Sequence, residues 1–323
     1  MSYQTLITKD LQNPVSLEDL GYNYFGPLVF NFFYWLKDEV SNGDLVLFNS
    51  REGYFLEEIY NIFKPKYNLP ESVYFKTSRK LSSISSFKTE EDIYDSFKLH
   101  RFNGTLGELM KNRFNVQIDD NTPIDTTIEL PNLTAYINKI LNKSKNLNIN
   151  YKEYIDNIIK NKKNVYMVDS GYQGSTQYYL QKAFNLNLKG RYITYKANLN
   201  LNNTKGLYDF EKYNFKNNII FFESVFTDKV GTYSDIVDGQ FINETNSENQ
   251  LYFEDKVKII NGIKDYIEDI FHTKKFTDIS LDLSDFIFNL MCTNGFVKNN
   301  SLFQNFYHDN TYVRSEIKKI QQY

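Results

Sequence analysis

Alternating apolar and polar segments open the chain and predict successive helices and strands. Residues Leu17 to Ser41 show helical spacing of apolar side chains, and the polar turn Asn42-Gly43-Asp44 separates them from a short buried strand, Leu45 to Phe48. We expect a helix over Gly53 to Phe63, which Lys64-Pro65 ends. Strand-helix-strand order is typical of a parallel sheet, and its second strand is expected over Ser72 to Thr77.

The middle of the chain leaves this pattern and then returns to it. Residues 90–150 are polar and mostly helical in spacing, which indicates an inserted helical segment. The apolar run Val165 to Asp169 predicts the next buried strand, followed by a helix from Gln173 to Phe184 and a strand from Gly190 to Lys196. The fold class expected is therefore α/β, with a mostly parallel, Rossmann-like sheet and a helical insertion.

The last third of the chain favours helices. Apolar spacing predicts helical segments over Asn217 to Phe226, Glu254 to His272 and Leu281 to Met291, and a loop over Asn243 to Asn249. We therefore expect an α/β domain over residues 1–232 and a mainly helical region over residues 233–323 that packs on it.

Composition and charge narrow the classes of function. The 323 residues carry a formal net charge of -3, so no global basic field indicates nucleic acid as a partner. The single cysteine, Cys292, lies in an apolar stretch and is expected to be a buried thiol, and the three histidines lack metal-ligand spacing. No signal peptide is evident at the start, so we expect a cytoplasmic protein. The apolar run Leu28 to Leu36 is too short to span a bilayer and is interpreted as a core helix, although peripheral docking at the inner membrane face would use the same residues.

The stretch Asp169-Ser170-Gly171-Tyr172-Gln173-Gly174-Ser175-Thr176 joins a strand to a helix and is typical of a phosphate-binding turn. A P-loop is the weakest interpretation, because no lysine follows Gly174. A dinucleotide or methyltransferase loop requires an acid at the end of the next strand, and Arg191 to Lys196 ends without one. The order apolar strand, acid, glycine loop and Gly-Ser-Thr best resembles the phosphoribosyl pyrophosphate (PRPP) signature of phosphoribosyltransferases.

Two further polar loops follow the predicted strands at the same edge of the sheet. The first contains Ser50-Arg51-Glu52-Gly53, and the second contains Ser78-Arg79-Lys80. Arginine binds phosphate oxygens through paired hydrogen bonds, and amides at a helix start add to that attraction. Each loop alone would be an ordinary surface turn, but three such loops at one edge predict a site for a pyrophosphate or phosphate.

Taken in order, these segments resemble a glycosyltransferase module of bacterial capsule and O-antigen clusters, which is usually fused to a haloacid-dehalogenase-type phosphatase. The matching features are Tyr22 to Pro27, the Ser50 to Leu56 loop, Ser78-Arg79, the Asp169 to Thr176 loop, and Glu223 with Gly231-Thr232. Some members of this module resemble phosphoribosyltransferases that transfer 5-phosphoribosyl from PRPP to a glycan. The chain departs from phosphoribosyltransferases at Ser170, where their signature has a second acid, and it shows no phosphatase motif.

The resemblance implies a role for each candidate residue. Asp169 would hold the ribose, and Gly171 to Thr176 would form the loop around the 5-phosphate. Ser170 would also belong to the donor-binding residues, and Tyr172 or Gln173 would shape the pocket. Arg51, with Arg79 or Lys80, would hold the pyrophosphate together with Ser50, Glu52 and Gly53, and Glu223 would act as general base or acceptor contact. The cofactor implied is Mg²⁺ carried by the donor, and the partners implied are a glycan or lipid-linked glycan acceptor and a separate phosphatase.

Two other functions stay open at this point. A nucleotide sugar can replace PRPP as the donor of a glycosyltransferase in the same glycan setting. Alternatively, the chain is a non-catalytic scaffold subunit that recruits a phosphatase or a glycosyltransferase of a polysaccharide synthesis complex.

Overall fold

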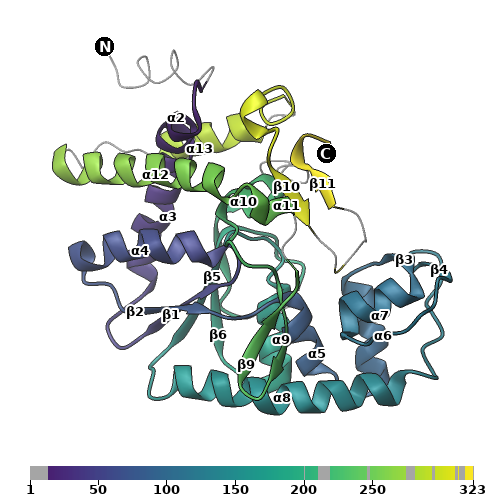
Figure 1. The fold of residues 1–323 in the computed structure, drawn as a ribbon. Coiled ribbons are helices and arrows are strands. Elements are labelled where there is room, and N and C mark those ends of the chain that lie inside the picture. The colour runs from purple at the N-terminus through teal and green to yellow at the C-terminus, as the bar shows by residue number, and fades with distance from the viewer. Residues whose placement is uncertain are drawn as a thin grey trace.

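A computed structural model describes residues 14–199, 201–209, 219–245, 248–273, 281–292, 295–309, 312 and 317–322. Its centre is a five-stranded sheet in the order β2-β1-β5-β6-β7, and every neighbouring pair is parallel (Figure 1). The strands are β1 (Leu45–Asn49), β2 (Glu71–Phe75), β5 (Val165–Asp169), β6 (Leu188–Tyr195) and β7 (Lys205–Asp209). The α/β class and the parallel sheet expected from the sequence are confirmed.

Strands β1 and β5 are buried on both faces. Val46 and Phe48 of β1 point into one hydrophobic core, whereas Leu45 and Leu47 point into another. Side chains alternate between the faces of a strand, so a continuous apolar run is needed where both faces are covered. This explains why both strands stand out in the sequence as uninterrupted apolar runs.

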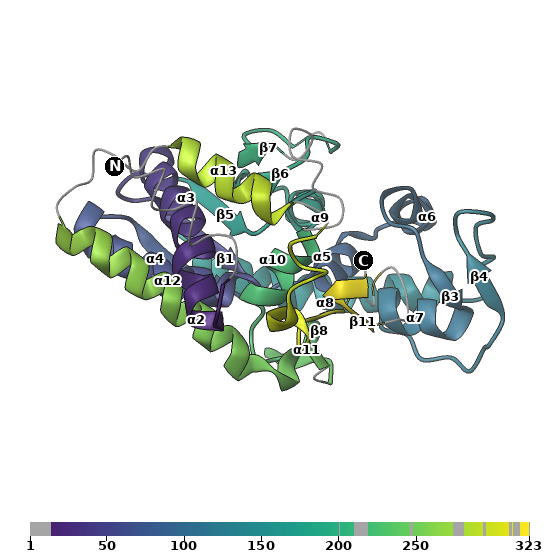
Figure 2. The same ribbon diagram turned by 90° about the horizontal axis from the view of Figure 1, so that it is seen from above.

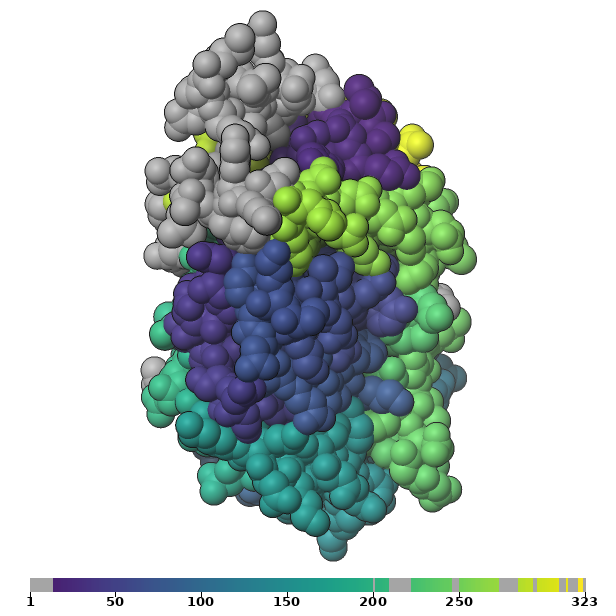
Figure 3. Space-filling model, turned by 90° about the vertical axis from the view of Figure 1, so that its left-hand side faces the viewer, coloured from purple at the N-terminus to yellow at the C-terminus, as the bar shows by residue number. Residues whose placement is uncertain are grey.

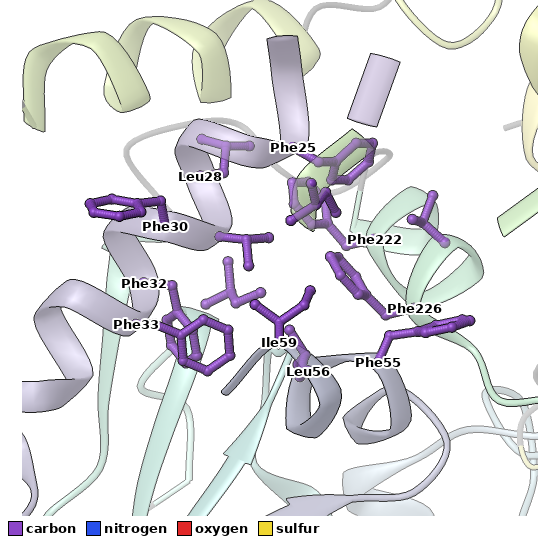
Figure 4. Packing of buried hydrophobic residues seen from close by; sticks show 14 of the residues in the cluster. Phe25, Leu28, Phe30, Phe32, Phe33, Phe55, Leu56, Ile59, Phe222 and Phe226 are labelled. Carbon is purple, nitrogen blue, oxygen red and sulfur yellow. The ribbon is translucent and has the colours of Figure 1, made fainter. Parts of the chain in front are cut away.

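Helices from the two halves of the chain cover the first face. Phe25, Phe32, Phe55 and Phe226 are among the side chains that gather there (Figure 4). The helices are α2 (Leu17–Leu20), the π-helix η1 (Gly21–Phe25), α3 (Gly26–Glu39), α4 (Gly53–Tyr67), α10 (Ile219–Phe226), α12 (Phe253–Thr273) and α13 (Leu281–Met291).

The N-terminal helices and α12 cross at very short range. A Cβ on Gly21 would lie 2.0 Å from the carbonyl oxygen of Ile259, and a Cβ on Gly262 would lie 2.0 Å from that of Glu18. Glycine at both positions therefore lets the backbones touch. Helix α12 packs directly against α2 in this way, and the two lie together above α4 in Figure 3.

The second face is covered by α5, α8 and α9. Helices α5 (Arg79–Ser86) and α9 (Ser175–Phe184) lie side by side, and the long helix α8 (Ile137–Ile159) packs against α5 (Figure 1). The predicted insertion contains α6 (Glu90–Leu99), β3 (Asn103–Thr105), α7 (Leu106–Phe114) and β4 (Pro123–Asp125) before α8 begins. It projects to one side of the sheet, as the view from above shows (Figure 2).

Small elements complete the described chain. They are the hairpin β8 (Tyr233–Val237) and β9 (Gln240–Asn243), the helices α11 (Glu248–Leu251), η4 (Ser301–Phe303) and η5 (Ile320–Gln322), and the paired strands β10 (Tyr307–Asp309) and β11 (Ile317–Lys319). The described helices include none with the length and apolar character needed to cross a bilayer.

Several predicted boundaries are wrong for local reasons. Helix α4 continues through Pro65 to Tyr67 and ends at Asn68, whose left-handed φ of 51° lets its N–H bond to the carbonyl of Lys64. Helix α9 begins at Ser175 rather than Gln173, because Gly174 has a φ of 70°. The loop predicted over Asn243 to Asn249 includes the end of β9 and the start of α11, and its residues 246–247 lie outside the described residues. Residues 217–218 of another predicted helix also lie outside them.

Candidate active site

A pocket lies at the carboxyl ends of β1, β2 and β5. The chain runs outward from β1 to β2, and after α8 it returns to the other side of β1 as β5. Open α/β sheets bind ligands at such a reversal of strand order, because the loops on either side diverge and leave a crevice. The pocket is lined by nine residues that the sequence predicted: Ser50, Arg51, Glu52, Arg79, Lys80, Asp169, Gly171, Thr176 and Glu223.

The loop after β1 is tied to both neighbouring strands. Asn49 Nδ2 donates to Asp169 Oδ2 at 3.0 Å, across the reversal of strand order. Ser50 Oγ donates to the carbonyl oxygen of Thr77 at 2.6 Å and accepts from the Thr77 N–H at 3.0 Å. The Ser50 hydroxyl therefore holds two loops together at the pocket wall.

Arg51 and Glu52 follow at the pocket wall. Arg51 Nη2 lies 3.9 Å from Glu52 Oε1, and both side chains are 14% exposed. Gly53 begins α4, where a Cβ would lie 2.5 Å from the main-chain carbonyl carbon of Phe48. Glycine at this position lets the helix start directly behind the strand, which brings its first amides near the pocket.

The Asp169 to Thr176 loop makes a sharp turn into α9. Gly171 and Gly174 have φ values of 150° and 70°, and the Ser50–Arg51 and Gly171–Tyr172 peptide bonds are both cis. The carbonyl oxygens of Ser170 and Tyr172 accept from the N–H groups of Thr194 and Lys196 at 3.2 and 2.8 Å, which fixes the loop to the end of β6.

Six of the predicted residues do not line the pocket. They are Gly53, Ser170, Tyr172, Gln173, Gly174 and Ser175. Ser170 is 1% exposed, so the residue that replaces the second acid of the PRPP signature is buried beneath the loop. Tyr172 packs against the first hydrophobic core.

The loop after β2 brings two cations to the same pocket. Ser78 caps α5 by accepting from the Leu81 N–H at 2.9 Å, and its hydroxyl donates to the Tyr233 carbonyl. Arg79 Nε donates to Ser175 Oγ at 3.1 Å and so links the starts of α5 and α9. The buried Lys80 ammonium donates to Glu244 Oε1 at 2.8 Å.

Four carboxyl groups line the same pocket, those of Glu52, Asp169, Glu223 and Glu244. Burial, the neighbouring Glu52 and the charge of Glu223 raise the pKa of Asp169 from 3.8 to about 8, although the hydrogen bond from Asn49 acts in the other direction. Asp169 is therefore protonated at neutral pH unless a cation or a hydrogen-bonding ligand stabilises its charge. A perturbed carboxyl in a pocket is typical of functional sites.

Two residues that line the pocket have buried hydroxyl groups. Thr77 and Tyr312 are 1% and 6% exposed, and their hydroxyls lie next to those of Tyr151 and Tyr179, respectively. Buried polar groups nearly always have hydrogen-bond partners in folded proteins. Thr77 and Tyr312 therefore join the pocket wall to the buried tyrosines behind it.

Comparison with known proteins finds no matching family model and no similar curated protein. What this site does must therefore be inferred from its own chemistry. Within the described part of the chain, no cluster of three histidine, cysteine, aspartate or glutamate side chains could hold a metal ion.

Four residues of the pocket were missed by the sequence interpretation: Thr77, Asn112, Glu244 and Tyr312. Thr77 adjoins a predicted loop and could have been found from the end of its strand. The other three come from α7, from the segment after β9 and from the C-terminal region. No local pattern marks them, because only tertiary packing brings them to the sheet edge.

Proposed function

We propose that this protein is a glycosyltransferase that transfers 5-phosphoribosyl from PRPP to a hydroxyl group of a glycan acceptor. The observation that carries the proposal is the meeting of three strand-end loops in one pocket. They contribute the acid Asp169, the glycine turn that starts α9, and the cations Arg51, Arg79 and Lys80. A donor with a phosphate at one end and a pyrophosphate at the other matches this distribution.

Each end of the donor has a group suited to it. Amides at the start of α9, with the Thr176 hydroxyl, would hold the 5-phosphate, and Asp169 would hold the ribose hydroxyls. Arg51 and Arg79 would hold the pyrophosphate through charge-assisted hydrogen bonds. Magnesium bound to the pyrophosphate would offset the charge of the leaving group.

The reaction would replace one bond at the anomeric carbon by another. The bond from C1 to a pyrophosphate oxygen breaks, and the acceptor oxygen forms a bond to C1 while its proton passes to a carboxylate. Glu223 lines the pocket from α10 and is the candidate for that base. Negative carboxyl groups near C1 would also stabilise the positive charge that develops on the ribose.

A binding screen tests the donor. PRPP with magnesium is compared with common nucleotide sugars by thermal unfolding, since a ligand that binds only the folded state raises Tm. We expect PRPP to raise Tm and the nucleotide sugars to leave it unchanged. If a nucleotide sugar raises Tm and PRPP does not, the donor is a nucleotide sugar. If neither raises Tm, the scaffold subunit is favoured.

Variants at the two ends of the pocket test the transfer itself. Asp169→Ala and Arg51→Ala are expected to abolish consumption of PRPP in the presence of acceptor while the far-ultraviolet circular dichroism spectrum stays unchanged. Arg101→Ala removes an exposed arginine outside the pocket and serves as the matched control. Normal turnover by both pocket variants would refute the assignment.

A further inference from the structure

Tyr312 lines the donor pocket although it belongs to the C-terminal region, far along the chain from the strand-end loops. Its ring contacts two guanidinium groups. Arg79 Cζ is 5.6 Å from the centre of its ring, and Arg113 Cζ is 4.7 Å from it. The ring of His100 meets Tyr312 edge-on at 5.4 Å between centroids. The face of an aromatic ring attracts a nearby guanidinium, so the contacts with Arg79 and Arg113 hold the side chains in place.

Arg113 anchors this arrangement from the inserted helical segment. It lies on α7 and is completely buried. Arg113 Nε donates to the main-chain carbonyl of Tyr312 at 2.9 Å, and Nη2 donates to the carbonyls of His100 and Arg101. A rigid planar fork of donors can bridge several carbonyls at fixed angles, which a flexible lysine cannot do. Arg113 thus joins the end of α6 to the C-terminal region.

Arg79 is the point at which this arrangement reaches the pocket. Its Nε donates to Ser175 Oγ, the first residue of α9, while its guanidinium lies against the ring of Tyr312. Phosphate oxygens bind arginine through the N–H groups along the edge of the guanidinium plane, whereas an aromatic ring contacts its face. The ring of Tyr312 therefore sets the tilt of the group that faces the ligand.

We infer that Tyr312 is a positioning residue for Arg79 in the anion-binding end of the pocket, and that Arg113 holds Tyr312 in place. The inference rests on the proposed function only in that the anion is taken to be the donor's pyrophosphate. The C-terminal region, through Tyr312, and the inserted helices, through Arg113, thus act together to position Arg79. The sequence of neither segment indicates this role.

The test uses magnesium pyrophosphate as the ligand and isothermal titration calorimetry as the measurement. Tyr312→Ala is expected to raise Kd about tenfold, whereas Tyr312→Phe keeps the aromatic ring and should stay within about twofold of wild type. The variant Arg79→Ala and the double variant Arg79→Ala/Tyr312→Ala complete a thermodynamic cycle. If Tyr312 acts through Arg79, the double variant should bind no more weakly than Arg79→Ala alone.

Two results would overturn the inference. One is additivity of the two alanine effects, and the other is equal weakening by Tyr312→Phe and Tyr312→Ala. Should Tyr312→Ala fail to fold, Tyr312→Leu fills the volume without an aromatic face and takes its place in the cycle. Wild type that binds pyrophosphate with this coupling, yet never consumes PRPP, would remove the proposed function and leave the positioning role intact. Wild type that binds no pyrophosphate would overturn the role assigned to Arg79 and Tyr312.

Discussion

Asn49 and Asp169 are joined by a 3.0 Å hydrogen bond between the ends of β1 and β5. These strands are neighbours in the sheet but are separated by 120 residues in the chain. The bond crosses the point where strand order reverses, so it fixes one oxygen of Asp169 and directs the carboxyl group at the pocket. Because its pKa is about 8, the Asp169 carboxyl group can gain or lose a proton when a ligand binds near it.

Asp169→Asn is expected to stabilise the protein at alkaline pH. The folded state holds the Asp169 proton more tightly than the unfolded chain does, so the free energy of unfolding falls as pH rises from 3.8 to about 8. The variant lacks this loss. At pH 9 its free energy of unfolding should exceed that of wild type by more than about 1.4 kcal/mol, which corresponds to one unit of pKa shift. Urea unfolding at pH 5 and pH 9 measures it.

The control for this substitution is Asp38→Asn, because the Asp38 side chain is 70% exposed. Its effect on unfolding should stay within about 0.5 kcal/mol at both pH values. An equal gain from both substitutions, or a gain from Asp169→Asn that is the same at pH 5 and pH 9, would contradict the raised pKa.

Donor binding is expected to release a proton near neutral pH. Magnesium and the ribose hydroxyls favour the charged form of Asp169, so its pKa should fall from about 8 when PRPP binds. Titration calorimetry at pH 7 in buffers of different ionisation enthalpy counts the protons released. The Asp169→Asn variant should release fewer protons than wild type when PRPP binds. If both release the same number, the proton comes from another group.

Gly174→Ala is expected to impair both folding and donor binding. The φ of 70° is unfavourable for alanine, and the added Cβ would lie 2.7 Å from Leu201 Cδ1. We expect a loss of about 1–2 kcal/mol in unfolding free energy and weaker protection by PRPP. Thermal unfolding with and without PRPP measures both effects.

Gly239→Ala provides a matched control for the glycine test. Gly239 has a φ of 74°, but a Cβ there would meet nothing within 4 Å. It should show the cost of the backbone conformation alone and keep full protection by PRPP. If the two variants behave alike, the close packing of the Gly174 turn has no bearing on the ligand.

Glu244→Gln is expected to destabilise the protein by roughly 1–3 kcal/mol, because the Lys80 side chain is 5% exposed and would lose its counter-charge. Chemical unfolding at low and high salt measures the loss. The exposed pair Lys98–Asp95 is the comparison, and Asp95→Asn should cost less than about 1 kcal/mol. Equal losses from the two substitutions would show that burial of Lys80 adds nothing to its ion pair.

The sequence by itself determined the α/β class, the buried strands β1 and β5 and most of the polar residues at their ends. Its signals were local: uninterrupted apolar runs for strands buried on both faces, and glycine with small polar residues at the turns. The same signals failed at β7, at the paired strands β3 and β4, and at the β8–β9 hairpin, which were not predicted. These strands are short or lie at edges, so their patterns resemble those of loops.

Only the tertiary structure decided which side chains share the pocket. It turned the Ser50 hydroxyl toward Thr77, paired Lys80 with Glu244, and buried Ser170 beneath the loop. It also brought Tyr312 to Arg79 through the buried Arg113. Each of these contacts joins residues distant in sequence or depends on how helices and loops pack on the sheet. The local spacing of residue types therefore cannot predict these contacts.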